Sequence, residues 1–208
     1  VHLCWLLLVV FSLSLLVGYR SRLSAAICFL LYLFFVGRNP LLLQRGDTLM
    51  PLLLCWGAFL PIGKVFAVDG ALDRKRDLSG STTVFSVATI GMLLQVLYVY
   101  VIGALLKTGY AWFPGGAAVT ISLHLDTFVT LPGLVLREFV PLSIFLTYFG
   151  FFIELLSPFL LFFPDRHYRV RNLTLVLLAA MHLGFRLFLN IGHFWLASLN
   201  SLMVYTPS

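Results

Sequence analysis

The feature that most constrains this chain is an almost uninterrupted apolar run from Val84 to Leu106. A helix that crosses the ~30 Å hydrocarbon core of a bilayer needs about 20 predominantly apolar residues, and this run is long enough. It ends at one charged residue, Lys107, which is followed by a polar and aromatic stretch with a Pro-Gly-Gly turn at 114–116. We therefore expect a transmembrane helix whose end places the Lys107 amine where hydrocarbon gives way to headgroups.

The same apolar character extends over the whole chain, which is 61% hydrophobic and only 11% charged. Soluble domains carry about 25% charged residues, so this composition predicts a polytopic membrane protein, with the lipid bilayer as its partner. The net charge of +6 is spread between apolar runs without a basic stripe, so we expect no nucleic-acid partner. The three cysteines lack CxxC spacing, which predicts neither a metal site nor a disulfide framework.

We predict an all-α fold in which about six spans form a single transmembrane helical bundle over residues 1–208. The spans are expected at Leu3–Val17, Leu23–Val36, Leu49–Phe66, Val84–Leu106, Phe139–Phe163 and Leu173–Met203. Segment 108–138, after the fourth span, is long for a loop, so we expect a re-entrant or interfacial piece with a short helix. Because the chain begins at Val1 and is apolar from Leu3 onward, we also expect a fragment or processed chain that lacks an upstream helix.

The basic residues predict how these spans are oriented. Threading the spans places most Lys and Arg residues on one side of the membrane: Arg20, Arg22, Lys64, Arg74, Lys75, Arg76, Arg166, Arg169 and Arg171. The opposite side holds fewer of them: Arg38, Arg45, Lys107 and Arg137. By the positive-inside rule the first side is cytoplasmic, so we expect Lys107 and segment 108–138 on the non-cytoplasmic side.

Ionisable residues inside apolar spans are costly and indicate a functional site by default. Glu154 lies in the middle of the fifth expected span, and the sixth carries His182, Arg186 and His193. At 100° per residue these three and Asn200 share one narrow stripe of a continuous helix, which we expect to face the bundle interior or a wet cavity. A structural alternative is a buried ion pair between Glu154 and Arg186, with the histidines as hydrogen-bonded core residues.

Lys107 has two interpretations. In the first, its ammonium reaches water at the end of a transmembrane helix beside an anchoring Trp112. In the second, the amine is kept in a dry environment so that it can accept a proton as a general base. The spacing of His182 and His193 matches no local metal-ligand motif, and no phosphate loop, GxSxG or HExxH motif supports a nucleotide or hydrolase function.

From about Asn39 to the C-terminus, several motifs follow one another in a characteristic order. They are Arg45-Gly46-Asp47 to Phe59-Leu60-Pro61, Ala67-Val68-Asp69, Tyr100 followed by Lys107, Trp112 and Gly115, Glu154…Pro158, and His182 with Ile191-Gly192-His193-Phe194. Together they resemble the HTTM (horizontally transferred transmembrane) domain family, to which vitamin K-dependent gamma-carboxylase belongs. A histidine that the carboxylase carries before the third span falls at Gly46 in this sequence.

The resemblance implies a carboxylase-like membrane enzyme of the carbon-carbon lyase class. In the carboxylase, a lysine matching Lys107 is regarded as the base that deprotonates reduced vitamin K, and the activated product removes a glutamate proton before carbon dioxide adds. We therefore expect reduced vitamin K or another lipid quinol as cofactor, and a protein or small acidic substrate on the outer side. Catalytic roles fall to Lys107 and His182, with five further residues in the pocket: Tyr100, Trp112, Glu154, Arg186 and His193.

Two other functions stay open at this point. The chain could be a non-catalytic membrane scaffold or transporter component, in which Lys107 faces water. It could also be a proton- or ion-conducting bundle, in which the polar stripe from His182 to Asn200 lines a continuous aqueous path. Convergence of Lys107, Trp112, His182 and Glu154 on one cavity that opens toward the outer leaflet would favour catalysis.

Overall fold

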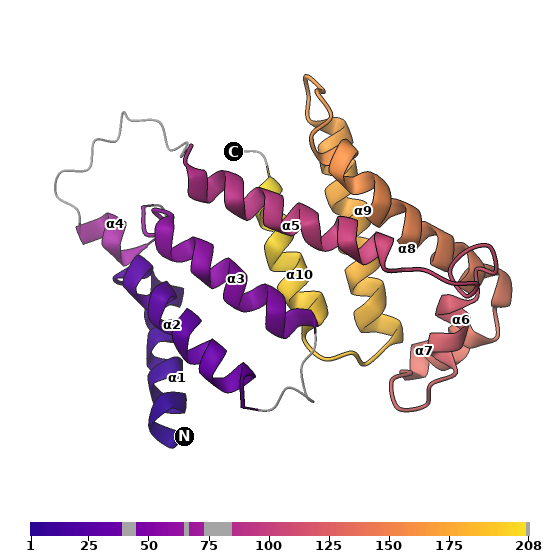
Figure 1. Ribbon diagram of the computed structural model, residues 1–208, viewed down its shortest axis with the longest axis horizontal. Helices are drawn as coiled ribbons and strands as arrows, with labels where there is room; N and C mark the ends of the chain where they lie inside the picture. The colour runs from indigo at the N-terminus through magenta and orange to yellow at the C-terminus, as the bar shows by residue number, and fades with distance from the viewer. Residues whose placement is uncertain (39–44, 65–66, 73–84, 207–208) are drawn as a thin grey trace. The chain divides into compact units, whose positions relative to one another are not determined.

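The computed structural model describes residues 1–38, 45–64, 67–72 and 85–206 of the 208-residue chain. These residues form ten α-helices and a short 3-10 turn, so the predicted all-α fold is confirmed (Figure 1). The chain divides into two compact units, Val1–Met92 and Leu93–Ser208. Most of the predicted polar loop at 69–83, with Arg74, Lys75 and Arg76, lies outside the described residues.

The first unit is built from four helices that follow the first three predicted spans. They are α1 (His2–Val17), α2 (Ser21–Val36), α3 (Arg45–Phe59) and α4 (Val68–Leu72). α2 packs against both α1 and α3. α3 starts before the predicted Leu49 and ends at Phe59, well before the predicted Phe66. Proline ring geometry and the missing N–H at Pro61 disfavour a longer helix.

α4 holds the corner between α1 and α2. The Asp69 carboxylate accepts hydrogen bonds from the backbone N–H groups of Arg20 and Ser21, both at 2.7 Å, and from the Ser21 hydroxyl at 2.8 Å. The Asp69 N–H in turn donates to the Gly18 carbonyl at 2.9 Å. Gly18 has a φ of +73°, and a Cβ there would lie 2.3 Å from the Ala67 Cβ, so this corner requires glycine. The hydrogen bonds from Ser21, backbone first, lower the pKa of Asp69 below its usual value.

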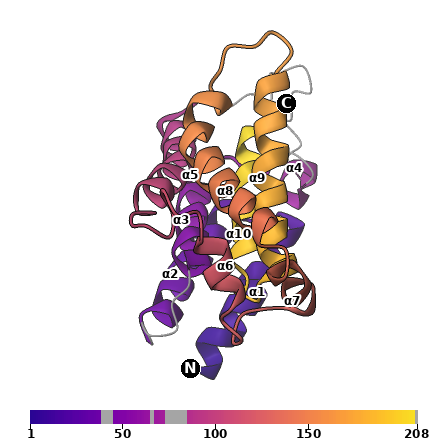
Figure 2. The same cartoon turned by 90° about the vertical axis from the view of Figure 1, so that its right-hand side faces the viewer.

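The second unit carries the longer apolar helices. α5 (Val87–Leu105) enters it from the first unit, and the others follow: α6 (Ala118–Leu123), α7 (Leu131–Arg137), α8 (Val140–Leu161), α9 (Arg169–Phe188), α10 (Phe194–Leu202) and the 3-10 turn η2 (Met203–Tyr205). α8 packs beside α9, α10 packs against α9, and α6 and α7 contact α8 (Figures 1 and 2). Within the described ranges, α5, α8 and α9 are long and apolar enough to cross a membrane, as expected for an integral membrane protein.

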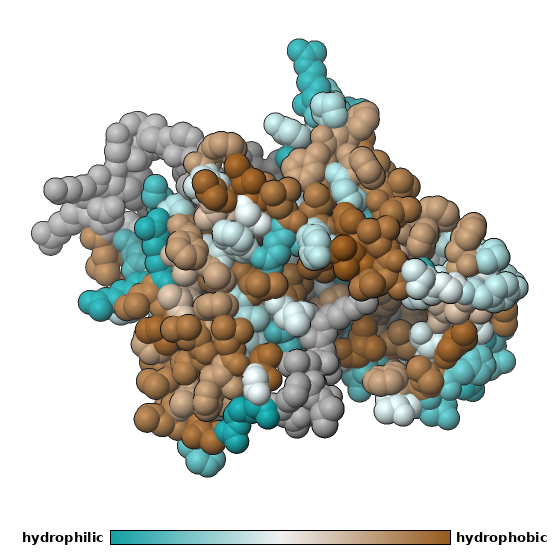
Figure 3. Space-filling view, viewed as in Figure 1, coloured by the Kyte–Doolittle hydropathy of each residue, from teal (hydrophilic) through white to brown (hydrophobic). Residues whose placement is uncertain are grey.

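α8 illustrates how side chains are distributed between the buried and the exposed faces of these helices. Its buried face is mostly small and polar, with Ser143, Thr147, Gly150, Glu154 and Ser157, and it also includes Ile153 and Leu161. Its exposed face carries large aromatic side chains: Phe145, Phe152 and Phe159. The space-filling view shows apolar residues over much of the visible surface of this region (Figure 3). A polar interior beneath an apolar exterior is the reverse of a soluble helix and suits contact with lipid.

The sixth predicted span is not one continuous helix, and that prediction is wrong. α9 ends at Phe188 and α10 begins at Phe194. The backbone N–H and the hydroxyl of Thr130 donate to the carbonyls of Phe188 and Leu187 at 3.1 and 2.6 Å, so the end of α9 is satisfied from outside the helix. Gly192, in the connection, has a φ of +70°, which breaks the helical path.

Candidate functional site

Lys107 lies just beyond the C-terminal end of α5. Its backbone N–H donates to the Ala104 carbonyl at 3.0 Å, and its Nζ turns back to donate to the Gly103 carbonyl at 3.1 Å. Lysine side chains near a helix C-terminus commonly satisfy its last carbonyls in this way. The Lys107 side chain is only 9% exposed, which favours the dry amine over the water-facing one.

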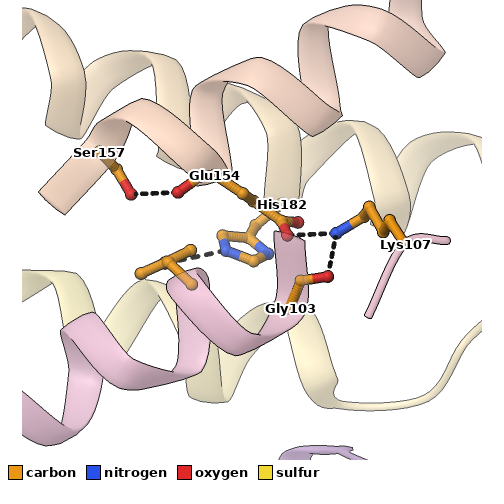
Figure 4. Close-up of polar contacts among 6 residues, drawn as sticks. Gly103, Lys107, Glu154, Ser157 and His182 are labelled. Atoms are coloured by element: carbon orange, nitrogen blue, oxygen red, sulfur yellow. Dashed lines mark hydrogen bonds and ion pairs between the residues drawn. The ribbon is translucent and has the colours of Figure 1, made fainter. Parts of the chain in front are cut away.

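The partner of this amine is Glu154, in the middle of α8. Nζ of Lys107 donates to Oε2 of Glu154 and forms an ion pair, and the Glu154 side chain is also only 9% exposed (Figure 4). The alternative of an ion pair between Glu154 and Arg186 is therefore wrong, because Lys107 is the partner of Glu154 and Arg186 is exposed. Removing one member of a buried pair is costly, because the other charge then stays in a poorly solvated place.

The sequence after Glu154 explains how its position on α8 is fixed. Pro158 lacks the N–H that would bond to the Glu154 carbonyl one turn earlier. The Ser157 hydroxyl donates to that carbonyl instead, at 2.9 Å (Figure 4). A Ser-Pro pair thus leaves the backbone satisfied at the turn that carries the acid, which matters most where no water can replace the lost bond.

A second polar pair lies beside the first. The hydroxyl of Tyr100 on α5 lies 3.0 Å from Nε2 of His182 on α9. His182 is 2% exposed, and the rings of Phe185 and Phe194 meet it edge-on at centroid distances of 5.9 and 5.5 Å. Its other ring nitrogen, Nδ1, is buried without a hydrogen-bond partner in the described part of the chain. Figure 4 places the imidazole next to the Lys107–Glu154 pair.

The segment after α5 covers Lys107 with an aromatic ring. Nζ of Lys107 lies 5.2 Å from the centroid of the Trp112 ring, within the range of a cation–π contact. The turn that follows is docked on α8, because the Tyr148 hydroxyl donates to the Pro114 carbonyl at 2.5 Å. At Gly116, with a φ of +65°, a Cβ would lie 2.9 Å from the Tyr148 ring, so the docking requires glycine.

The structure therefore brings together five of the seven predicted site residues. Lys107 contacts Glu154 and Trp112 directly, and the pair of Tyr100 and His182 lies beside them. Glu154 comes from α8 and His182 from α9, whereas the other three come from α5 and the segment that follows it. The other two predicted residues, Arg186 and His193, are exposed, as is Asn200. The predicted interior stripe from His182 to Asn200 is wrong, because Arg186 is exposed on α9 itself and because the helix ends at Phe188, before His193 and Asn200.

Sequence reasoning missed two groups that complete the site. The Gly103 carbonyl holds Lys107, and the Ser157 hydroxyl supports the Glu154 backbone. Each left a local signal, since Gly103 precedes Lys107 by one helical turn and Ser157 directly precedes Pro158. In the described ranges no group of three or more His, Cys, Asp or Glu side chains could hold a metal ion. An amine, a carboxylate and an imidazole side by side can transfer protons.

Comparison with known families supports the resemblance noted in the sequence. The model of the HTTM domain matches residues 1–208, which is the whole chain. The match therefore also covers α1 and α2, which precede the motifs on which that resemblance rests. Comparisons with proteins of curated function and with solved structures gave no significant match.

Proposed function

Because this chain belongs to the HTTM domain family, we propose that it is a carboxylase-like integral membrane enzyme in which Lys107 is the base for a lipid-borne acid. The observation that carries the proposal is the buried ion pair between Lys107 and Glu154 at the end of α5. An amine that only anchored a helix would not need an acidic partner from the middle of α8, where a carboxylate is costly.

The residues of the site suit a lipid quinol, such as reduced vitamin K. A quinol offers an acidic hydroxyl on an aromatic ring, and the site offers an amine, a Trp112 ring and the unpartnered Nδ1 of His182. When bound, such a quinol would supply the oxidisable group whose reaction with oxygen drives removal of a proton from a carbon acid. Lys107, Trp112 and His182 would hold its hydroxyl end.

The pair can take up a proton from the substrate after an internal proton transfer, which itself leaves the total charge of the pair at zero. Lys107 passes a proton from Nζ to the Glu154 carboxylate and becomes a neutral amine. The amine then takes the proton of the substrate hydroxyl, so the net transfer is from that hydroxyl to Glu154. At the end, the Lys107 ammonium faces the oxyanion that it has created, and attraction in a poorly solvated site favours this product.

The arrangement of the chain in the membrane is part of the proposal. α5, α8 and α9 would cross the bilayer, and α1, α2 and α3 would complete the bundle of about six spans. Segment 108–138, with α6 and α7, would lie at the non-cytoplasmic interface, where a protein or small acidic substrate arrives. A lipid quinol would then reach Lys107 laterally, from within the bilayer.

The proposal is tested by turnover of purified protein in lipid nanodiscs. A tail-free 1,4-naphthohydroquinone is added with oxygen, radiolabelled bicarbonate and a glutamate peptide, and quinol oxidation and label fixation are followed. We expect Lys107→Ala to abolish both signals. Lys64→Ala is the matched control, because Lys64 is an exposed lysine of the first unit and should leave both signals unchanged.

Two outcomes would remove the enzymatic assignment. If Lys107→Ala oxidises the quinol at the wild-type rate, Lys107 is not the base. If the wild-type protein neither oxidises the quinol nor fixes label, and Lys107→Arg is silent in every assay, a scaffold or transporter component is the better description.

A further inference from the structure

We infer that Nδ1–H of His182 is a hydrogen-bond donor that binds the reacting oxygen of the substrate beside Lys107, and that Tyr100 sets the tautomer that makes it a donor. The inference rests on the proposed function for the identity of that oxygen. It assigns His182 a binding role at one named atom, and it makes Tyr100 a positioning residue that acts through His182.

The tautomer follows from the chemistry of the Tyr100–His182 contact. In a neutral imidazole one nitrogen carries hydrogen and the other accepts a hydrogen bond. A phenol is a good donor and a poor acceptor, whereas a bare imidazole nitrogen is a strong acceptor. The 3.0 Å contact is therefore best made by the Tyr100 O–H donating to Nε2. The remaining hydrogen of the ring then lies on Nδ1.

This assignment leaves a buried donor without an acceptor. Nδ1 of His182 has no hydrogen-bond partner among the described residues, and the residue is 2% exposed. Leaving a buried N–H unpaired is costly, so such groups call for a specific explanation. Binding of a substrate oxygen during the reaction cycle supplies one.

The position of the His182 ring agrees with binding of a substrate oxygen at Nδ1. Figure 4 shows one imidazole nitrogen on the side of Lys107 and Glu154, while the other faces its hydrogen-bonded partner. The edge-on rings of Phe185 and Phe194 offer the imidazole no polar atom. An oxygen held between Nδ1–H of His182 and Nζ of Lys107 would meet two donors, which is the arrangement that stabilises an oxyanion.

The tautomer can be measured without any turnover. Protein labelled with ¹⁵N-histidine is placed in lipid nanodiscs, and the Nδ1 resonance of His182 is assigned by difference from His182→Gln, or from single substitutions of the other four histidines should that variant misfold. We expect a protonated Nδ1 in the wild type. Tyr100→Phe removes the hydroxyl that donates to Nε2. We then expect the ring hydrogen to move from Nδ1 to Nε2 in a large part of the population.

Binding is measured with 2-methyl-1,4-naphthoquinone, whose carbonyl oxygens accept hydrogen bonds but which cannot be deprotonated. We expect it to shift the Nδ1–H resonance of His182. His182→Asn places an amide nitrogen near Nδ1, whereas His182→Gln places one near Nε2. The quinone should therefore bind His182→Gln roughly tenfold more weakly than His182→Asn, as expected for one lost hydrogen bond. His124→Asn, an exposed control, should bind like the wild type.

A bare Nδ1 in the wild type, or equal quinone affinity of His182→Asn and His182→Gln, would overturn the inference. These outcomes are separate from failure of the proposed function. Turnover that depends on Lys107 together with a bare Nδ1 removes only the role given to His182. A protonated, quinone-responsive Nδ1 without any turnover supports that role and removes the catalytic one.

Discussion

Asp69 in the first unit and Glu154 in the second are both held by direct hydrogen bonds, but the donors differ in kind. Asp69 in the first unit accepts from two backbone N–H groups and a serine hydroxyl, none of which gives up a proton under ordinary conditions. Glu154 in the second unit accepts from the amine of Lys107, which does exchange protons. The type of donor, and not the strength of the contact, thus distinguishes the carboxylate that can take part in proton transfer from the structural one.

The surroundings of the two groups reinforce this difference. Asp69 caps α2 at a corner of the first unit, where water can take over its hydrogen bonds if they are lost. Glu154 is buried on α8, and its side chain and that of Lys107 are each only 9% exposed. Substitution of Glu154 should therefore affect both folding and turnover, whereas substitution of Asp69 should affect folding alone.

The largest effect is expected for Glu154→Ala, which leaves the buried Lys107 without its acid. Loss of one partner of a buried ion pair costs about 3–5 kcal/mol, so the thermal midpoint in detergent should fall strongly. The double variant Lys107→Leu/Glu154→Leu should recover most of that stability and none of the turnover. Recovery of turnover in the double variant would contradict the chemical role of the pair and make it a structural contact like that of Asp69.

The next largest effect is expected at the Asp69 corner itself. Gly18→Ala forces an L residue into a φ of +73° and places a Cβ against Ala67, which should destabilise the first unit by about 1–3 kcal/mol. Turnover per folded molecule should stay at the wild-type level. Gly184→Ala on α9 is the matched control, because a Cβ there meets no atom within 4 Å, and its thermal midpoint should not fall. A loss of turnover in Gly18→Ala that exceeds the loss of folded protein would break the contrast between the two units.

Much of the fold behind this contrast could be predicted from the sequence, because the length of apolar runs and the spacing of polar residues indicate where helices lie. The boundaries of α1, α2, α5 and α8 fell within a few residues of the predicted spans, since apolar runs and the turns between them set helix length in a membrane. Lys107 and Glu154 were each recognisable as ionisable groups in apolar surroundings, whose cost demands a partner.

The pairing itself could not be predicted, because it depends on which helices face one another. Arg186 was the alternative partner considered for Glu154, but Lys107 forms that pair. The predicted continuous sixth helix also breaks where Thr130 caps α9 from outside. Asn190 and Gly192 after Phe188 are typical helix-stop residues and could have signalled the break. The tertiary contact with Thr130 left no such signal.

A smaller effect is expected for the backbone that supports Glu154. Ser157→Ala removes the hydroxyl that bonds to the carbonyl freed by Pro158 and should cost about 1 kcal/mol. In a Pro158→Ala background, the restored N–H can bond to that carbonyl, so Ser157→Ala should cost less there. The double-mutant cycle is measured by thermal unfolding. Equal costs in both backgrounds would show that Ser157 does not compensate for the proline.

The smallest effect, and the one that separates the two carboxylates most cleanly, is the acid dependence of stability. The pKa of Asp69 is held below its ordinary 3.8 by the hydrogen bonds from Ser21. Because the folded-state pKa is the lower one, this contribution is fully present above the unfolded-state value and is lost as pH falls through the folded-state value. Asp69→Asn should therefore lower the thermal midpoint at neutral pH and flatten its decline below about pH 4.

Asp165, in the loop before α9, provides the matched second case in the other unit. The backbone N–H of His167 contributes most to lowering its pKa, and the N–H groups of Val170 and Arg169 add to it, so Asp165→Asn should flatten the acid decline in the same way. Neither variant should change turnover at neutral pH, because backbone N–H groups keep their protons whether or not the carboxylate is present. If Asp69→Asn or Asp165→Asn slowed turnover, as substitution of Glu154 is expected to do, donor type would no longer distinguish a carboxylate that takes part in proton transfer from one that caps a helix.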